Sequence, residues 1–295
     1  MSSISFQSFG RTLSGIVLAA TGALGAGNAL AASTSADGCS DLNGFTPNRL
    51  VYALTQAQAL VSFHACNPGK ERKLGAVSGL QGADTALVGI DFRVQDGLLY
   101  GVGNGGGVYT IDTTNGVATH ASQLTQALSG TRFGVNFNPA ANALRIVSDN
   151  GQNLRHPFVT PEPRTTFVDA PLSFVAGTVA SGIAAIAYTN NDLDASTNTF
   201  LFDLDAAQDQ LALQAPANNG TLTAAGKLGM DVDSSVGFDI YTRVVDGVAR
   251  TNTAFASFNV AGVPGFYRLN LTTGRPTLVG TLAEPLVAFS VDLDK

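Results

Sequence analysis

Four polar residues in this chain have the types and the spacing expected of ligands around one central axis. Two carboxylates with an amide oxygen and a hydroxyl form a set of hard ligands of the kind that Ca²⁺ prefers. The alternative is structural, because such residues also bind channel water or satisfy backbone groups at strand ends. The four residues are Asp91, Asn136, Asp239 and Ser290, and each is the fourth residue of a five-residue pattern that recurs along the chain. A calcium site at the axis is therefore one hypothesis for their role.

The pattern occurs five times, at an interval typical of one propeller blade. Successive fourth positions lie 45, 51, 52 and 51 residues apart. In the third copy of the pattern the fourth residue is Ala187. A four-stranded blade takes about 40 to 50 residues. The second position is always Gly or Ala, and it shares a strand face with the fourth. Small residues there favour close approach of inner strands. The copies are 88–92, 133–137, 184–188, 236–240 and 287–291.

The remaining sequence predicts an all-β fold. Asp96-Gly97 and Asn115-Gly116 are hairpin signals between apolar runs, and no helical apolar period persists for three turns. The segment 50–80 lacks the pattern, whereas 286–293 has it with nothing after it. We therefore predict a single β-propeller of five four-stranded blades over residues 48–295, closed by the C-terminal strand in the N-terminal blade. Six blades are the alternative, if a divergent repeat lies within 33–48 or 150–182.

A second group of polar side chains lies in the middle repeat. Arg145 and Asp149 share a strand face, and a turn at Asn150-Gly151 returns the chain beside them. Guanidinium groups bind planar anions through paired hydrogen bonds. The group could therefore hold a carboxylate or sugar hydroxyls, or it could be an inter-blade network that replaces hydrophobic packing. The ligand-binding candidates are Arg145, Asp149, Gln152, Asn153 and Arg155.

No arrangement typical of catalysis accompanies these groups in the sequence. The three histidines lie in different repeats without metal-ligand spacing, and no G-x-S-x-G motif is present. We therefore predict no catalytic residue and an exported, non-catalytic binding or scaffold propeller. The alternative is a channel-centred, calcium-dependent hydrolase such as a lactonase or esterase, with Asp91, Asn136 and Asp239 as metal ligands. Apart from calcium, no cofactor is expected.

The first 31 residues predict export. Arg11 precedes the weakly apolar run 13–24, which is too short for a membrane span, and Ala29-Leu30-Ala31 matches a cleavage site. We expect a signal peptide at 1–31, a linker at 32–47, and a mature protein in the periplasm or outside the cell. In that oxidising compartment Cys39 and Cys66 are predicted to form a disulfide, and two unpaired thiols are the alternative.

The charge balance argues against polyanionic partners. The chain has 22 acidic and 16 basic residues, a formal charge of −6 and no basic run. Nucleic acids and anionic membranes are bound through clustered Lys and Arg. We therefore expect a monomer that binds a protein, peptide or small-molecule ligand, with no nucleic acid and no membrane span.

Several segments resemble the bacterial secreted proteins grouped as domain of unknown function 4394. They are 87–93, 99–102, 109–112, 133–139, 145–155 and 187–191, of which 145–155 is the most specific. The resemblance implies an exported bacterial protein with a propeller-like fold and, because the family has no assigned activity, no catalytic residues. One departure is the proline-rich stretch 156–164, which leaves the third and fourth strands of that blade without a prediction.

Overall fold

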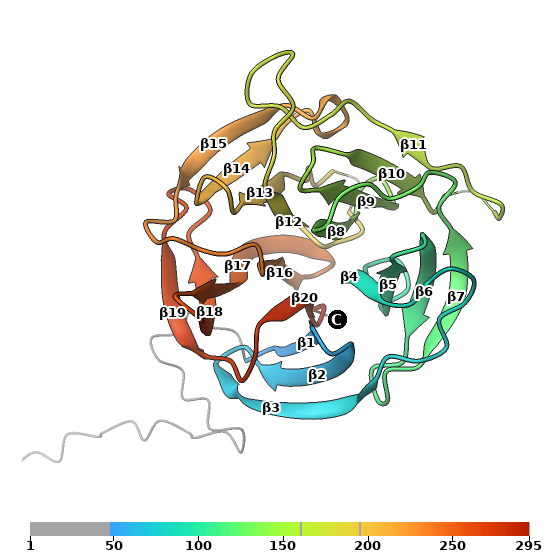
Figure 1. The fold of residues 1–295 in the computed structure, drawn as a ribbon, viewed down its shortest axis with the longest axis horizontal. Helices are drawn as coiled ribbons and strands as arrows, with labels where there is room; N and C mark the ends of the chain where they lie inside the picture. The colour runs from blue at the N-terminus through green and yellow to red at the C-terminus, as the bar shows by residue number, and fades with distance from the viewer. Residues whose placement is uncertain (1–47, 160, 195, 295) are drawn as a thin grey trace, which may run out of the picture. The chain divides into compact units, whose positions relative to one another are not determined.

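Five four-stranded antiparallel sheets stand around a central axis, as Figure 1 shows. The computed structural model describes residues 48–294 except 160 and 195. Within these residues the only helical element is the 3₁₀ turn η1 (Ala217–Asn219). The predicted all-β propeller with five blades is therefore confirmed.

The first blade joins the two ends of the described chain. From the axis outward its strands are β20 (Leu286–Val291), β1 (Leu50–Thr55), β2 (Ala59–His64) and β3 (Asn67–Ala76). β20 pairs antiparallel with β1, and Ser290 lies opposite Tyr52. The C-terminal strand thus completes the N-terminal blade, as predicted.

The other four blades follow one another along the chain, each built from its inner strand outward. Blade 2 contains β4 (Leu87–Arg93), β5 (Leu98–Gly103), β6 (Gly107–Ile111) and β7 (Ala118–Gln123). Blade 3 contains β8 (Phe133–Asn138), β9 (Ala143–Ser148), β10 (Asn153–Pro157) and β11 (Phe167–Val168). Blade 4 contains β12 (Ile183–Tyr188), β13 (Leu201–Asp205), β14 (Gln210–Gln214) and β15 (Leu222–Lys227). Blade 5 contains β16 (Gly237–Val245), β17 (Val248–Val260), β18 (Val263–Leu269) and β19 (Pro276–Thr281).

The hydrophobic core lies between the blades. Five clusters of buried apolar side chains each draw residues mainly from two neighbouring blades. Between blades 5 and 1, for example, the ring of Phe63 packs edge-on against Phe266, with centroids 5.1 Å apart. Each blade therefore depends on its two neighbours for burial, and closure of the ring supplies the last interface.

The inner strands approach one another so closely that the glycines at their second positions have no room for a Cβ atom. A Cβ atom on Gly89 would lie 2.4 Å from Cγ2 of Val135, in the next blade. A Cβ atom on Gly134 would lie 2.8 Å from the backbone nitrogen of Ile186, again in the next blade. The Gly/Ala column thus reflects real crowding, and it brings the fourth positions, two residues further on, together at the axis.

Blade 3 has the shortest outer strand of the described blades, and it follows the proline-rich stretch. β10 forms over five residues, whereas β11 has only two. Between them Phe158 packs edge-on against Tyr100 and Phe137, with centroid distances of 5.5 and 5.2 Å. Proline cannot donate to a strand ladder, and the segment covers the blade 2 to blade 3 interface with an aromatic ring.

Three predictions fall on residues outside the described part of the chain. These are the signal peptide at 1–31, the linker at 32–47 and the disulfide partner Cys39, so all three stay predictions. Cys66 lies in the turn between β2 and β3. Among the described residues, no helix has the length and apolar character to cross a bilayer.

Candidate functional site

The polar fourth-position side chains meet at the axis and tie neighbouring inner strands together at four of the five blade junctions. In each case a side-chain oxygen accepts the backbone N–H of the residue after the fourth position in the following blade. Such N–H groups lie on the free edge of an inner strand, where no further strand can pair with them. The contacts are Phe137 N to Asp91 Oδ2 at 2.6 Å, Tyr188 N to Asn136 Oδ1 at 2.9 Å, Val291 N to Asp239 Oδ2 at 2.7 Å and Phe92 N to Ser290 Oγ at 3.2 Å. We call these four residues the axial ring.

The alanine at the fourth position of blade 4 is compensated by its neighbour. Ala187 has no oxygen to accept the N–H of Ile240 in blade 5. The second carboxylate oxygen of Asp239, Oδ1, accepts that N–H instead, at 2.8 Å. The N–H of Ile240 is therefore satisfied within its own strand, so this bond replaces the missing acceptor but does not link blade 4 to blade 5.

Hydrogen counting around Ser290 indicates a further proton in the axial ring. Its Oγ lies 2.9 Å from Oδ1 of Asp91 and 3.1 Å from Oδ2 of Asp239, and it also accepts the N–H of Phe92. A hydroxyl has one hydrogen and can donate to only one of two carboxylates. Both contacts are hydrogen bonds when one carboxyl is protonated and donates to Ser290.

The electrostatics of the two carboxyls agree with this count. Asp91 and Asp239 are 5% and 3% exposed, and neither belongs to an ion pair within the described residues. Burial raises the pKa of Asp239 to about 6. Burial, together with the charge of Asp239, raises the pKa of Asp91 well above its ordinary value. Two unneutralised charges at this depth are unfavourable, so the ring needs a shared proton or a bound cation.

The calcium hypothesis therefore meets a specific geometric requirement. All four carboxylate oxygens of Asp91 and Asp239, and Oδ1 of Asn136, already accept hydrogen bonds from the chain. A Ca²⁺ ion takes six to eight oxygen ligands, so it would have to share or displace these donors. The metal assignment of Asp91, Asn136, Asp239 and Ser290 stays a prediction.

We expect Ca²⁺ to leave the thermal stability of the purified protein unchanged. The physical reason is that backbone and hydroxyl donors already occupy the oxygens of the axial ring. The measurement is the Tm in EDTA and in millimolar Ca²⁺, with Mg²⁺ as the control for ionic strength, alongside elemental analysis of the protein. A rise in Tm specific to Ca²⁺, with stoichiometric bound calcium, would establish the metal site in place of the shared proton.

The middle-repeat candidates separate into two groups in the structure. The buried group is centred on Arg145, which is only 3% exposed in its side chain. Its guanidinium donates to Asn153 Oδ1 at 2.6 Å, Asp169 Oδ2 at 2.9 Å and Asn218 Oδ1 at 2.6 Å. Arg155 pairs with both oxygens of the same Asp169, at 3.1 and 3.2 Å. The hydrogen bonds of the two guanidinium groups therefore run to acceptors of the protein itself.

Asp149 and Gln152 lie in a different place. Asp149 accepts hydrogen bonds from the backbone and hydroxyl of Thr131. Gln152 accepts the N–H of Ser129 at 2.9 Å and donates to the carbonyl of Ala127 at 2.9 Å. Both side chains therefore fasten the loop before β8 to the β9–β10 turn. The five candidates do not converge on one site.

Sequence reasoning missed a buried carboxylate close to this cluster. Asp203 in β13 is fully buried, and neither of its oxygens has a hydrogen-bond partner among the described residues. Burial raises its pKa well above the ordinary value, and the positive charge of Arg145 opposes that shift. The available signal was the alternation in Leu201-Phe202-Asp203-Leu204-Asp205, which places Asp203 on the same face as the buried Leu201.

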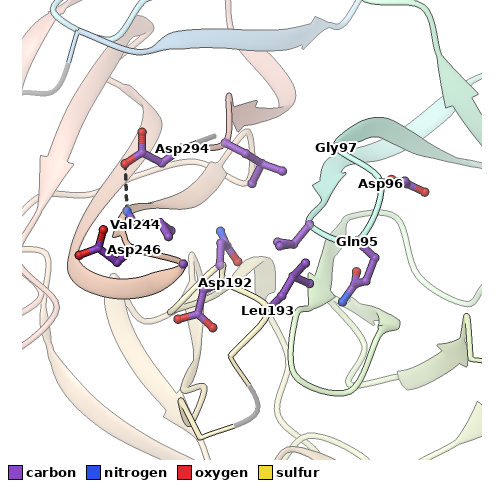
Figure 2. A pocket seen from close by; sticks show the side chains of 12 residues that line it. Gln95, Asp96, Gly97, Asp192, Leu193, Val244, Asp246 and Asp294 are labelled. Carbon is purple, nitrogen blue, oxygen red and sulfur yellow. Dashed lines mark hydrogen bonds between the residues drawn. The ribbon is translucent and has the colours of Figure 1, made fainter.

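Sequence reasoning also missed a cavity near the axis, because this cavity is built from loops. It has a volume of about 550 Å³ and lies where four of the five inner strands end. The residues come from the β4–β5 turn, the β12–β13 loop, the β16–β17 hairpin and the segment after β20 (Figure 2). The lining is Val94, Gln95, Asp96, Gly97, Asn191, Asp192, Leu193, Val244, Asp246, Gly247, Leu293 and Asp294. We call it the mouth pocket.

The opposite end of the axis is much narrower. A cavity of about 160 Å³ is lined there by the first residues of all five copies of the pattern, with four neighbouring residues. The first-position residues are Val88, Phe133, Ala184, Val236 and Val287. Since the axial ring lies between the two ends of these strands and is buried, it separates the small cavity from the mouth pocket.

Comparison with known proteins identifies a family without a described activity. Residues 59–290 match the family model "Domain of unknown function (DUF4394)", and no curated protein matches the chain. A chain from a nidogen/laminin complex is 8% identical, with a TM-score of 0.48 over 84% of this chain and 99% of that chain. An auxiliary nutrient binding protein from Bacteroides ovatus is 13% identical, with a TM-score of 0.41 over 72% of this chain and 56% of that chain. Likenesses at this level carry no argument about function.

Proposed function

Because the chain belongs to the DUF4394 family, which carries no described activity, we propose its role from its own geometry: it is a non-catalytic binding propeller. The observation that supports this is the mouth pocket over a closed axis. Its volume of about 550 Å³ lies within the range of small-molecule sites. The axial ring beneath it leaves no path through the centre, so a ligand enters and leaves by the same opening.

The composition of the mouth pocket supports binding in preference to chemistry. Its described lining contains no Ser, Cys, His or Lys that could serve as a nucleophile or base. Two of its four carboxylates are held in ion pairs with arginines outside the lining, Asp96 with Arg93 and Asp294 with Arg49. A third, Asp192, accepts the backbone N–H groups of Asp194 and Ala249, at 3.0 and 2.7 Å. These carboxylates hold the loops in place.

Export through the predicted signal peptide is part of the proposal. It would place the encounter with the ligand in the periplasm or outside the cell. A scaffold role in which a protein or peptide is the ligand uses the same opening. The calcium-dependent hydrolase remains the alternative, and the calcium measurement above separates it from the binding role.

The Leu193→Arg variant is expected to weaken binding to the mouth pocket at least about tenfold without loss of stability. Leu193 lines the pocket and is 65% exposed, so a longer charged side chain can enter the space without disturbing the core. The probe is 4-phenyl-1-butanol, a neutral molecule with an apolar body, for which we expect a Kd of a few millimolar, on the order of 0.3 kcal/mol per heavy atom.

The matched control is Val263→Arg, which also replaces an exposed aliphatic residue, 55% exposed, at the start of β18 in blade 5. Binding is followed by chemical-shift changes in the protein NMR spectrum, and stability by Tm. The proposal is wrong if the wild type shows no saturable binding, or if Leu193→Arg and Val263→Arg bind the probe equally well.

A further inference from the structure

The mouth pocket has a distinct electrostatic character, which narrows the class of its ligand. Of its twelve lining residues, four are aspartates and none is Lys, Arg or His. Resting on the proposed binding role, we propose that the pocket takes a small organic cation, with an apolar body in the centre and an ammonium group at the acidic rim.

The apolar body is expected from the centre of the pocket. Val94, Leu193, Val244 and Leu293 supply branched aliphatic side chains from four different segments. Figure 2 shows Leu193 between Asp192 and Gln95 near the middle of the opening, with the labelled carboxylates at the periphery and directed outward. Burial of an apolar group against such a surface contributes about 25 cal/mol for each Å² removed from water.

The cationic group is expected from the balance of charge at the rim. Arg93 and Arg49 offset the charges of Asp96 and Asp294 through ion pairs. Asp192 and Asp246 belong to no ion pair within the described residues. About two negative charges therefore remain at the opening, and their field attracts cations and repels anions.

A buried acceptor in the lining points to a ligand that donates hydrogen bonds. Gln95 donates through Nε2 to the carbonyl of Pro139 at 2.7 Å. Its Oε1 is buried and has no donor among the described residues. An unpaired buried acceptor is costly, and a turn of the Gln95 amide toward the pocket would let an ammonium or a hydroxyl supply the missing hydrogen bond, which a carboxylate or sulfonate cannot. This observation is independent of the aspartates.

The experiment compares three probes that share one apolar body. They are 4-phenylbutylammonium, 4-phenyl-1-butanol and 4-phenylbutyrate. We expect the ammonium to bind about threefold more tightly than the alcohol and at least about tenfold more tightly than the carboxylate. The alcohol differs from the ammonium by one unit of charge and the carboxylate by two, and the exposed acidic rim attracts the positive charge only weakly through water. Added salt is expected to weaken ammonium binding and to leave alcohol binding nearly unchanged.

The Asp246→Asn variant removes one of the rim charges with little change in structure. Asp246 has a φ of 54° and Gly247 one of 77°, in a two-residue hairpin turn that Asn-Gly also favours. It should weaken ammonium binding about two- to fivefold and change alcohol binding by a clearly smaller factor. The matched control is Asp231→Asn, in the exposed loop before β16, which should change neither.

The outcomes separate this inference from the proposed function. If the ammonium and the alcohol bind equally, and both binding events are lost in Leu193→Arg, the binding role holds and the charge preference is wrong. If the carboxylate binds most tightly, the inference is also wrong. If none of the three probes binds, both proposals fail.

Discussion

Arg145→Met is expected to lower the free energy of unfolding by about 3 to 5 kcal/mol, the range for breaking one partner out of a buried ionic network. The guanidinium is almost fully buried and donates to four side chains, those of Asn153, Asp169, Tyr188 and Asn218. Methionine fills much of the volume but donates nothing, so the buried Oδ1 of Asn153 loses its donor.

The neighbouring arginine gives a matched control. Arg155 pairs with the same carboxylate, Asp169, but its side chain is 28% exposed. Arg155→Met is therefore expected to cost no more than about 1 kcal/mol, as for exposed ion pairs. Chemical denaturation of both variants measures the difference. If both variants lose the same free energy of unfolding, the burial of Arg145 does not determine how much its hydrogen bonds stabilise the fold.

A conservative variant keeps the test informative if Arg145→Met does not fold. Arg145→Lys retains the charge that faces the buried Asp203 but cannot span the acceptors as a planar fork does. We expect it to fall between wild type and the methionine variant. Binding of 4-phenyl-1-butanol to the folded variant should be unchanged, because the cluster lies outside the lining of the mouth pocket. A selective loss of binding would instead assign the cluster to a ligand site.

The fold was predictable from the sequence because propeller geometry imposes a column of residues on every blade. Gly89 and Gly134 cannot carry a Cβ where inner strands cross most closely, and the residues two positions later must accept hydrogen bonds at the axis. Both demands act locally and repeat, so they are visible as a pattern. The C-terminal copy of the pattern supplies only the inner strand of a four-stranded blade, and this similarly revealed the closure of the ring.

The candidate sites were less predictable, because their contacts join segments without a common spacing. Arg145 was identified, but its partner Asn218 is 73 residues away in the turn η1. Nothing in the sequence near either residue indicates that pair. The mouth pocket is built from turns of different lengths after the inner strands, and turns carry no repeated pattern. Leu193, the residue we use to test it, resembles any exposed leucine in the sequence.

The second large effect is expected at the axial ring, where stability should fall as the pH rises above about 4. Burial raises the pKa of Asp239 to about 6 and that of Asp91 well above its ordinary value. In the folded state these carboxyls therefore keep protons that the unfolded chain releases near pH 4. Where the unfolded state binds fewer protons, unfolding becomes easier with rising pH, by up to about 1.4 kcal/mol per pH unit for each carboxyl.

The pH window follows from the pKa of about 6 for Asp239 and from the raised pKa of Asp91. Below about pH 4 both states are protonated, and the ring contributes no slope. Between about pH 4 and 6 both Asp91 and Asp239 contribute, and above that range only the carboxyl that keeps its proton does. The measurement is the free energy of unfolding by denaturant at a series of pH values. Other titrating groups add to the profile, so the comparison between variants is what identifies the ring.

Asp91→Asn should be more stable than wild type at pH 8, by about 1 to 3 kcal/mol, and similar to it near pH 4. An asparagine can accept the N–H of Phe137 through its carbonyl and donate through its amide to Ser290, so it supplies permanently the hydrogen that the ring otherwise takes from solution. The hydroxyl of Ser290 is then free to donate to Asp239.

Asn136→Asp provides the opposite change in the same ring, because it adds a third carboxyl beside Asp239, 3.5 Å from the present amide nitrogen. It should be destabilising at pH 8 and recover as the pH falls, since like charges in a buried site favour protonation. A bound cation predicts the reverse order: Asp91→Asn would lose a ligand and Asn136→Asp would gain one. The signs of these two changes at pH 8 therefore decide whether a proton or a metal ion neutralises the axis.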